Sequence, residues 1–218
     1  MKNRTGGRLG ALLRQRETSL LFVLILLCLA IQMRNSQFLT ANVINGILKN
    51  YAYTMVMAFG MMLVLLIGGI DISVGAILAL SGMSACQLMK NGLVQYGITV
   101  YAVSTGIGLL CGLITGLVIA KGKVIPIIAT LGFMYIYRGL TYIVSDSTWV
   151  GVAYMLDDFK DFAQSTFLGI NHLIWITVIV FAVFFVFLRW TTFGRKIYAV
   201  GSNAAAAEIS GIKIDRIK

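Results

Sequence analysis

The stretch Gly68-Gly69-Ile70-Asp71-Ile72-Ser73-Val74-Gly75 places one carboxylate between two long uncharged segments. Residues 50–70 and 72–89 carry no charged side chain, and Asp71 is the only acidic residue between residues 18 and 145. Carboxylates are rare in or near membrane spans because their desolvation is costly. Asp71 therefore lies either in a tight turn at a membrane face or within the bilayer, and the sequence leaves both placements open.

The composition of the chain is that of an integral membrane protein. Of its 218 residues, 59% are hydrophobic and 12% are charged, whereas soluble domains are about half apolar and about a quarter charged. The mean hydropathy is +0.89. We predict an all-α, polytopic transmembrane helix bundle that lies in the cytoplasmic membrane and contacts the lipid bilayer directly.

About six stretches are long and apolar enough to cross the membrane as helices. They lie in a transmembrane region at 19–190 that includes an external loop at 145–170, and the spans are predicted near residues 19–33, 51–69, 72–89, 96–119, 124–144 and 171–189. The first follows a basic leader, as a signal peptide would, but no small-x-small cleavage site follows residues 29–33. We interpret it as a retained anchor.

The distribution of Lys and Arg predicts the orientation. Most of the 18 basic residues lie before the first span, between the fourth and fifth spans, or after the sixth. Basic residues gather on the cytoplasmic side of membrane proteins. The basic N-terminus at 1–18 and the C-terminal segment at 191–218 are therefore both predicted to be cytoplasmic. The net charge of +10 is a topology signal, and no nucleic-acid partner is expected.

The residues that often bind metals are not clustered in this chain. Cys28, Cys86 and Cys111 all fall inside apolar spans, without the spacing of a disulfide framework or a metal site. His172 is the only histidine and lies at the outer edge of the sixth span. We expect a hydrogen-bonded imidazole there rather than a metal ligand.

Small residues form a stripe along the fourth predicted span. Ser104, Gly108, Gly112 and Gly116 recur every four residues, which places them on one helix face. We interpret this stripe as a surface on which another helix packs closely.

Asp71 and Arg138 are the charged groups of greatest interest within the spans. The double glycine at 68–69 allows a sharp reversal, and Asp71 or Ser73 can cap the next helix by accepting its free N–H groups. We favour this structural role over direct contact with a solute or an ion, which stays open for Asp71. Arg138 either reaches the membrane surface, bonds to a neighbouring helix or contacts a polar solute in a pathway.

The segment after residue 190 predicts a short cytoplasmic helix at about 204–210. Asn203 is a good N-cap, the run of four alanines after it favours a helix, and Gly211 is a good stop. A helix of two turns is unstable alone in water, so it must pack on this chain or on a soluble partner.

Two stretches resemble the ribose-type permeases of ABC importers, the inner-membrane components of binding-protein-dependent systems for simple sugars. Residues 68–75 are similar to the family's G-G-I-D-L-S-V-G signature, with isoleucine in place of leucine. Residues 193–212 are similar to its cytoplasmic loop G-R-x-x-Y-A-x-G-x-N-x-x-A-A-x-x-S-G-I, and residues 130–132 with 138–140 match a weaker third pattern. The signature turn comprises Gly68, Gly69, Asp71, Ser73 and Gly75.

The resemblance implies a function and its partners. Such permeases translocate a simple sugar or sugar-like solute by ATP-driven alternating access. They pair with a second permease subunit as homodimers or heterodimers, receive solute from an extracytoplasmic sugar-binding protein and dock a cytoplasmic ABC ATPase subunit. By resemblance, the ATPase-coupling segment 191–218 includes Gly194, Arg195, Gly201, Asn203, Ala207, Glu208 and Gly211.

This chain is not expected to be an enzyme or to bind a cofactor. It has no G-x-x-x-x-G-K-[ST] loop, so ATP and Mg are expected in the partner ATPase. Family members continue with further spans, and the resemblance thus implies a C-terminal truncation relative to the family. The alternatives are an ion-coupled secondary transporter subunit or a truncated, non-transporting membrane protein. The sequence specifies neither the solute nor the choice between homodimer and heterodimer.

Overall fold

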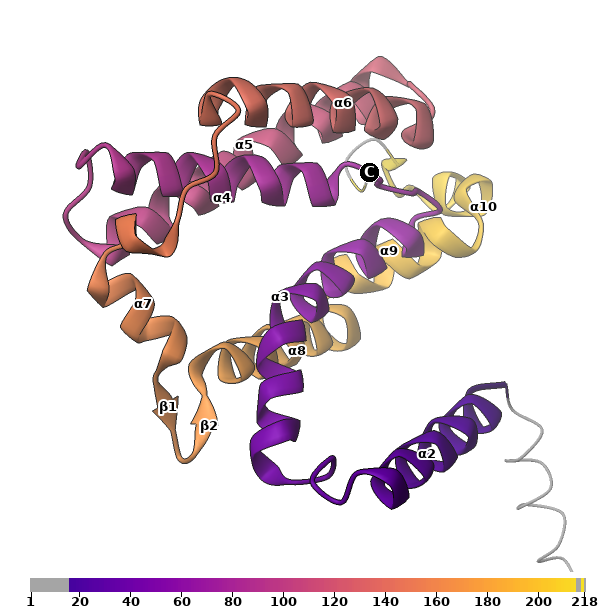
Figure 1. The fold of residues 1–218 in the computed structure, drawn as a ribbon. Coiled ribbons are helices and arrows are strands. Elements are labelled where there is room, and N and C mark those ends of the chain that lie inside the picture. Colours follow the sequence, from indigo (N-terminus) through magenta and orange to yellow (C-terminus); the bar gives the residue numbers. More distant parts are fainter. Residues whose placement is uncertain (1–15, 215–216, 218) are drawn as a thin grey trace, which may run out of the picture. The chain divides into compact units, whose positions relative to one another are not determined.

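The computed structural model of the chain describes residues 16–214 and residue 217 (Figure 1). The predicted N-terminal segment 1–18 lies almost wholly outside the described residues. Most of the described residues form helices that are joined by short connections. In chain order the elements are α2 (Arg16–Arg34), α3 (Ala41–Leu66), α4 (Val74–Lys90), α5 (Gly97–Gly122), α6 (Pro126–Ser145), the 3-10 helix η1 (Val152–Tyr154), α7 (Asp157–Gln164), β1 (Thr166–Phe167), β2 (Ile170–Asn171), α8 (His172–Trp190), α9 (Thr192–Ser202) and α10 (Ala204–Ile209).

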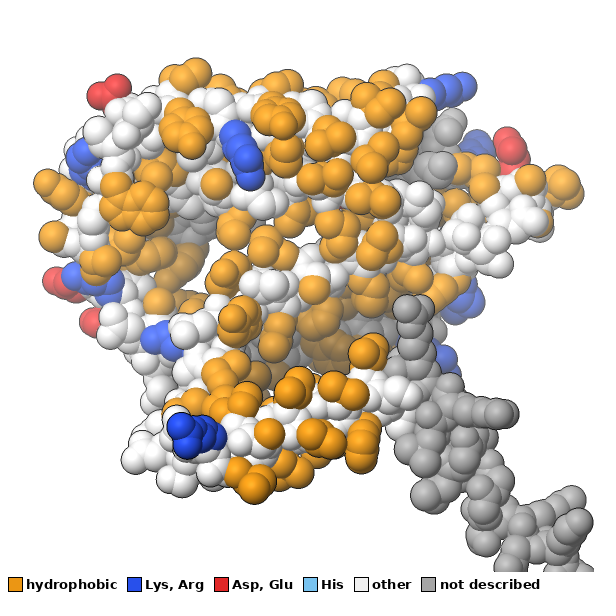
Figure 2. Space-filling model, turned by 45° about the vertical axis from the view of Figure 1, so that its right-hand side comes forward, with side chains coloured by type: hydrophobic (Ala, Val, Ile, Leu, Met, Phe, Trp, Pro, Cys, Tyr) orange, Lys and Arg blue, Asp and Glu red, His pale blue; other side chains and the backbone are white. Residues whose placement is uncertain are grey.

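Four of the described helices are long and apolar enough to cross a membrane, namely α3, α5, α6 and α8. Two shorter helices, α4 and the part of α2 from Thr18 onward, are also apolar. The 17 residues of α4 extend about 26 Å at the α-helical rise, slightly less than a hydrocarbon core about 30 Å thick. Hydrophobic side chains cover much of the face shown in Figure 2. The predicted fold class, a polytopic helical membrane bundle, is confirmed.

The chain divides into two compact units, residues 1–50 and residues 51–218. In the first unit, the Gln32 side chain organises the connection after α2. Its amide nitrogen donates to the Ser36 carbonyl oxygen at 2.8 Å, and its amide oxygen accepts from the Leu39 N–H at 2.9 Å. One side chain thus pairs two backbone groups of the connection between α2 and α3.

In the second unit, α4 packs against both α5 and α6 (Figure 1). Ala76 and Leu80 of α4, Cys111 of α5 and Tyr137 of α6 form one buried cluster. Small residues on α4 allow the three helices to approach closely, which is the usual source of helix association in a bilayer. The signature turn leads directly into α4, and residues of α5 and α6 lie beside it.

Residues 51–66 of α3 contact α8 through aromatic side chains. The Phe59 ring lies 5.6 Å from that of Phe181 and 6.1 Å from that of Phe184. The Thr177 hydroxyl donates to the Ala52 carbonyl oxygen at 3.4 Å. At the far end of α8, the chain continues directly into α9 and then α10.

The starts of α3 and α4 differ from the starts of the predicted spans for identifiable reasons. α3 starts at Ala41, well before residue 51, because the polar residues Asn45, Lys49 and Asn50 extend the helix beyond its apolar part. α4 starts at Val74 rather than 72, because the signature turn continues to Ser73.

The predicted external loop is an ordered segment that contains η1, α7 and a two-stranded antiparallel hairpin. The Asp158 carboxylate accepts from the Gly97 N–H at 2.5 Å and so joins α7 to the start of α5. The Tyr101 ring stacks on Phe159 with centroids 5.0 Å apart. Nearby, a hydrogen bond from Lys160 and its positive charge lower the pKa of the exposed Asp157 carboxyl.

Candidate functional site

The signature turn begins where α3 ends at Leu66. The Gly68 N–H donates to the Leu65 carbonyl oxygen and the Gly69 N–H to the Val64 carbonyl oxygen, at 3.0 and 2.9 Å. Gly68 has a φ of +80°, which L-residues other than glycine rarely adopt. A Cβ at Gly69 would lie 3.1 Å from a Val64 methyl group. The double glycine therefore permits the sharp end of the helix.

Asp71 holds the second half of the turn. One of its carboxylate oxygens accepts from the Ser73 N–H at 2.8 Å and from the Ser73 hydroxyl at 2.6 Å. Ser73 is fully buried and occupies the N-cap position of α4, but its side chain makes no capping bond. The expectation that Asp71 or Ser73 caps α4 is therefore wrong for Ser73, whose backbone is in the helical region instead of the extended conformation of a typical N-cap. Asp71 instead binds the residue before the helix.

One neighbouring helix, α6, contacts the turn through a buried threonine. Thr130 of α6 is fully buried, and its hydroxyl lies 3.3 Å from the Ile70 carbonyl oxygen and 3.4 Å from that of Ile127. Non-helical backbone at membrane depth is tolerated where it is buried in protein or lines a polar cavity. The Thr130 contact meets this condition for the Ile70 carbonyl.

A cavity of about 240 Å³ lies beside the turn. Its lining combines the turn with residues of α3, α5 and α6, which are Val64, Ile67, Gly68, Gly69, Ile70, Asp71, Gly112, Thr115, Gly116, Ile119, Pro126 and Thr130. Gly68, Gly69 and Asp71 of the signature thus come together at this cavity, whereas Ser73 is buried and does not line it. The site combines one carboxylate with two hydroxyl groups in an otherwise apolar wall.

The glycine stripe of α5 contributes to this cavity. A Cβ at Gly108, Gly112 or Gly116 would meet no atom within 4 Å among the described residues. Gly112 and Gly116 line the cavity. The prediction that another helix packs closely on this stripe is therefore not borne out within the described residues. Beside these glycines there is open space and not the backbone of a neighbouring helix.

A buried polar cluster supports the cavity from α5 and α6. The Tyr137 hydroxyl donates to the Cys111 carbonyl oxygen at 2.8 Å and lies 3.0 Å from the Thr115 hydroxyl. Thr115 in turn donates to the Cys111 carbonyl at 3.0 Å. Both hydroxyl groups are thus hydrogen-bonded, and the network fixes Thr115 at the cavity wall.

Arg138 lies apart from this cavity. It follows the buried Tyr137 on α6, and its own side chain is on the exposed face of that helix. Within the described part of the chain, no carboxylate or carbonyl oxygen accepts a hydrogen bond from it. The structure does not place Arg138 with the signature turn.

Several predicted coupling residues hold α9 against the rest of the second unit. A Cβ at Gly194 would overlap the carbonyl oxygen of Leu188 and lie 2.6 Å from that of Phe187. A Cβ at Gly201 would overlap the Leu66 carbonyl oxygen at the end of α3. Both glycines therefore allow backbones to approach where no side chain fits.

Thr191 forms the junction between α8 and α9. It is at once the last cap of α8 and the first cap of α9. Its hydroxyl donates to the Phe187 carbonyl oxygen at 2.6 Å and accepts from the Gly194 N–H at 3.0 Å. The two helices are joined without a loop.

α10 has the caps that the sequence predicts. The Asn203 side-chain oxygen accepts from the Ala206 N–H at 3.0 Å, and Gly211 has a φ of +82°. The predicted short helix after Asn203 is confirmed at Ala204–Ile209. Ala207 is buried, whereas Glu208 is exposed.

Ile209 is a candidate residue that the sequence analysis missed. It is 89% exposed at the end of α10, beside the exposed Glu208. Because it lies in the segment 191–218 that is predicted to be the coupling segment, it is a candidate contact for a partner protein. The sequence held a signal for this exposure. Residues two apart point to different faces of a helix, so that Ile209 is exposed if Ala207 is buried.

The other residues considered from the sequence form no site. Cys28, Cys86 and Cys111 are free thiols, and the described residues hold no group of three metal-ligating side chains. The Nδ1 atom of His172 is buried and accepts no hydrogen bond from any described residue, so the expected hydrogen-bonded imidazole is wrong for this atom. Its ring lies 5.4 Å from Phe162 instead.

Comparison with known proteins gives a consistent result. The family described as "Branched-chain amino acid transport system / permease component" matches residues 42–218. The chain is 38% identical over its whole length to the ribose import permease protein RbsC of Haemophilus influenzae, of which it covers 67%. It is 41% identical over 91% of its length to the ribose import permease protein RbsC of Bacillus subtilis, of which it covers 60%. It is 34% identical over 93% of its length to the L-arabinose ABC transporter permease protein AraH of Azospirillum brasilense, of which it covers 58%. No solved structure matches the chain.

Proposed function

The chain belongs to the family of transport-system permease components, and from this premise we propose that it is the multi-pass permease subunit of an ABC importer in the cytoplasmic membrane. The solute is a simple sugar or a sugar-like molecule. Translocation occurs by alternating access, driven by ATP hydrolysis in a separate ATPase subunit. The chain spans 58–67% of the length of the relatives compared, so this proposal concerns the transporter that it helps to form.

The choice of a sugar rests on the relatives rather than on the family description. That description names branched-chain amino acids, whereas the relatives compared are named for ribose and L-arabinose. The cavity at the signature turn is compatible with a polyol, because the Asp71 carboxylate can accept hydrogen bonds from hydroxyl groups. We assign Gly68, Gly69 and Asp71 to the wall of the pathway, with Ser73 and Gly75 in its support.

The contact with the ATPase is proposed at the end of α10. The single observation that carries this proposal is the exposed pair Glu208 and Ile209 on a helix fixed at its base by the Asn203 cap and the buried Ala207. Arg195 and Gly211 are also exposed on this side of the membrane. Gly194 and Gly201 act indirectly, since they hold α9 in place. ATP and Mg are bound by the partner, and an extracytoplasmic binding protein delivers the solute.

The ATPase contact is tested by capture of the host's ATPase subunit on the detergent-extracted protein. We expect a Glu208→Lys/Ile209→Asp double variant to retain the ATPase about tenfold less well, because it replaces an apolar contact and reverses a charge at an interface centre. The control is Asp157→Lys, which makes the same kind of charge change on the exposed outer helix α7. Equal capture by both variants and the unchanged protein would contradict the proposed contact.

Arg138 is proposed to contact a second permease subunit. An exposed guanidinium within a membrane-spanning helix needs a polar counterpart, since lipid tails provide none. We expect Arg138→Leu to reduce the dimeric fraction severalfold in native mass spectrometry. Lys123→Leu, which removes a cation just after α5, is the control. An Arg138→Leu protein that dimerises normally would show that Arg138 faces lipid or the solute pathway.

A further inference from the structure

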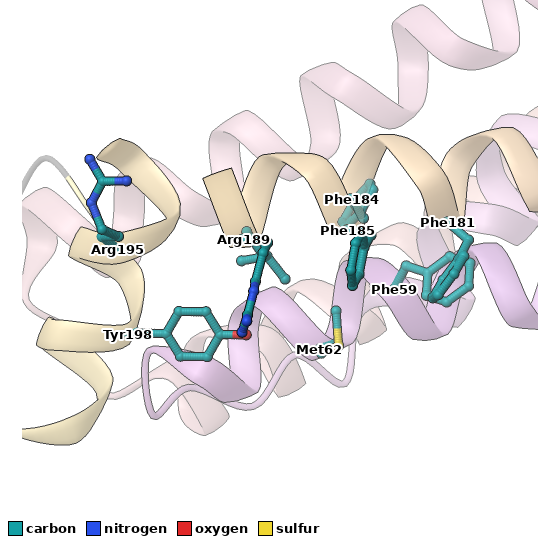
Figure 3. A pocket seen from close by; sticks show the side chains of 9 residues that line it. Phe59, Met62, Phe181, Phe184, Phe185, Arg189, Arg195 and Tyr198 are labelled. Atoms are coloured by element: carbon teal, nitrogen blue, oxygen red, sulfur yellow. The ribbon is translucent and has the colours of Figure 1, made fainter. Parts of the chain in front are cut away.

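A second cavity of about 490 Å³ lies between α3, α8 and α9, away from the signature turn (Figure 3). Phe59 and Met62 of α3 form one wall, and Phe181 and Phe185 of α8 form the other. All residues that line this cavity belong to the second unit. None of the residues assigned to solute transport or ATPase contact lines it, except Arg195 at its edge.

The greater part of this groove is apolar and aromatic. Phe59 contacts Phe181 with ring centroids 5.6 Å apart, and Leu188 beneath them is only 7% exposed. Phe181 and Phe185 nevertheless remain 53% and 51% exposed. Their rings therefore offer an open apolar surface along a membrane-spanning helix.

The opposite end of the groove is polar and positively charged. In Figure 3, Arg189 at the end of α8 and Tyr198 on α9 point toward each other, whereas Arg195 points away at the edge. No acidic residue lines the groove. The salt bridge found among the described residues joins Lys160 to Asp157 and involves neither arginine. Two cations thus stand at this end without a carboxylate partner there.

The position of the two ends in the membrane indicates the ligand. α8 crosses the membrane, and Arg189 and Trp190 form its cytoplasmic end in the orientation predicted from the basic residues. Trp190 is 67% exposed and contacts Phe185 edge to face, as an aromatic residue at the lipid headgroup level would. The aromatic part of the groove is therefore at the depth of acyl chains and the arginine end at the depth of phosphates.

We propose that this groove binds an anionic phospholipid of the cytoplasmic leaflet. An acyl chain lies against Phe59, Phe181 and Phe185, and the phosphate group accepts hydrogen bonds from Arg189 and Tyr198. Basic pockets between membrane helices on the cytoplasmic side suit such headgroups. The bound lipid bridges α3, α8 and α9, and thereby supports the segment that carries α10. Lipid binding at this groove rests on the predicted orientation of the chain and is independent of the solute and of the ATPase.

The test is native mass spectrometry of the full chain reconstituted with phosphatidylglycerol or phosphatidylcholine. We expect retention of phosphatidylglycerol but not phosphatidylcholine, and a loss of about fivefold or more in Arg189→Gln. The matched control is Lys196→Gln, which removes an equivalent charge from α9 at a residue that does not line the groove. Tyr198→Phe, which keeps the ring, isolates the contribution of the hydroxyl group and should reduce retention less than Arg189→Gln.

Four outcomes would overturn the proposal. Equal losses in Arg189→Gln and Lys196→Gln would indicate general attraction to a basic surface. Equal retention of both lipids would exclude recognition of the anionic headgroup. A second measurement uses phosphatidylglycerol with brominated acyl chains, which should quench Trp190 fluorescence in a protein whose other tryptophans are replaced by Phe. Absence of quenching, or displacement of the lipid by glycerol phosphate alone, would exclude an acyl chain in the groove.

Discussion

The variant Gly201→Ala is expected to lose most of its folded population in detergent. Its new methyl group would overlap the Leu66 carbonyl oxygen and lie 2.9 Å from the Leu66 carbonyl carbon. Both are backbone atoms at the end of α3, directly before the signature turn, so neither moves without displacing the turn. Overpacking costs about 1–3 kcal/mol and occasionally more, and a clash with backbone atoms belongs at the upper end, so the cost exceeds the gain of about 1 kcal/mol from alanine in a helix.

The measurement is the monodisperse fraction after extraction, together with the temperature at which it aggregates. Gly60→Ala is the matched control, because Gly60 is also helical and a Cβ there meets nothing within 4 Å among the described residues. We expect that control to be neutral or slightly stabilising. If Gly201→Ala folds normally and loses only ATPase capture, Gly201 acts at the docking surface and not through packing on α3.

Asp71→Ala is expected to destabilise the signature turn, whereas Asp71→Asn is expected to preserve it. Alanine leaves the N–H and the hydroxyl of the fully buried Ser73 without their acceptor. Each unpaired buried group costs about 1–3 kcal/mol. Asparagine retains an oxygen acceptor at the same position, so assembly of the Asp71→Asn protein should be close to normal.

Transport by the assembled importer separates the two roles of Asp71. Solute uptake into proteoliposomes should fall sharply in Asp71→Ala, together with its thermal stability, and Ser73→Ala should lie between Asp71→Ala and the unchanged protein. A stable Asp71→Asn protein that transports normally would support a purely structural carboxylate. A stable Asp71→Asn protein that fails to transport would show that the charge itself acts on the solute or an ion.

The sequence predicted helices and helix ends correctly where they depend on one residue or on one continuous apolar run. Asn203 and Gly211 delimit α10 as expected, because capping and positive φ are properties of individual residues. Long apolar runs predicted α5, α6 and α8 for a similar reason. α9 was missed, since its Gly194 and Gly201 are poor helix formers whose cost is offset only by contacts with α8 and α3.

The candidate site could be predicted only in part. The sequence singled out Asp71 and the double glycine, but not the direction of the Ser73 hydrogen bond, which depends on the exact path of the turn. It also could not show that Gly112 and Gly116 face a cavity. A stripe of small residues indicates one smooth helix face, and only the three-dimensional arrangement decides whether a backbone or a ligand occupies it.

The junction at Thr191 leaves no flexible segment between α8 and α9. A flexible loop there would absorb small movements of α9 relative to α8. Here a single residue caps both helices, and Gly194 lies directly against the Phe187 and Leu188 carbonyl groups. A displacement of α9 must therefore move α8 with it or break the Thr191 hydrogen bonds, and at its other end α9 meets the end of α3 at Gly201. The two membrane helices that flank the cytoplasmic end of the second unit are thus tied to one short helix.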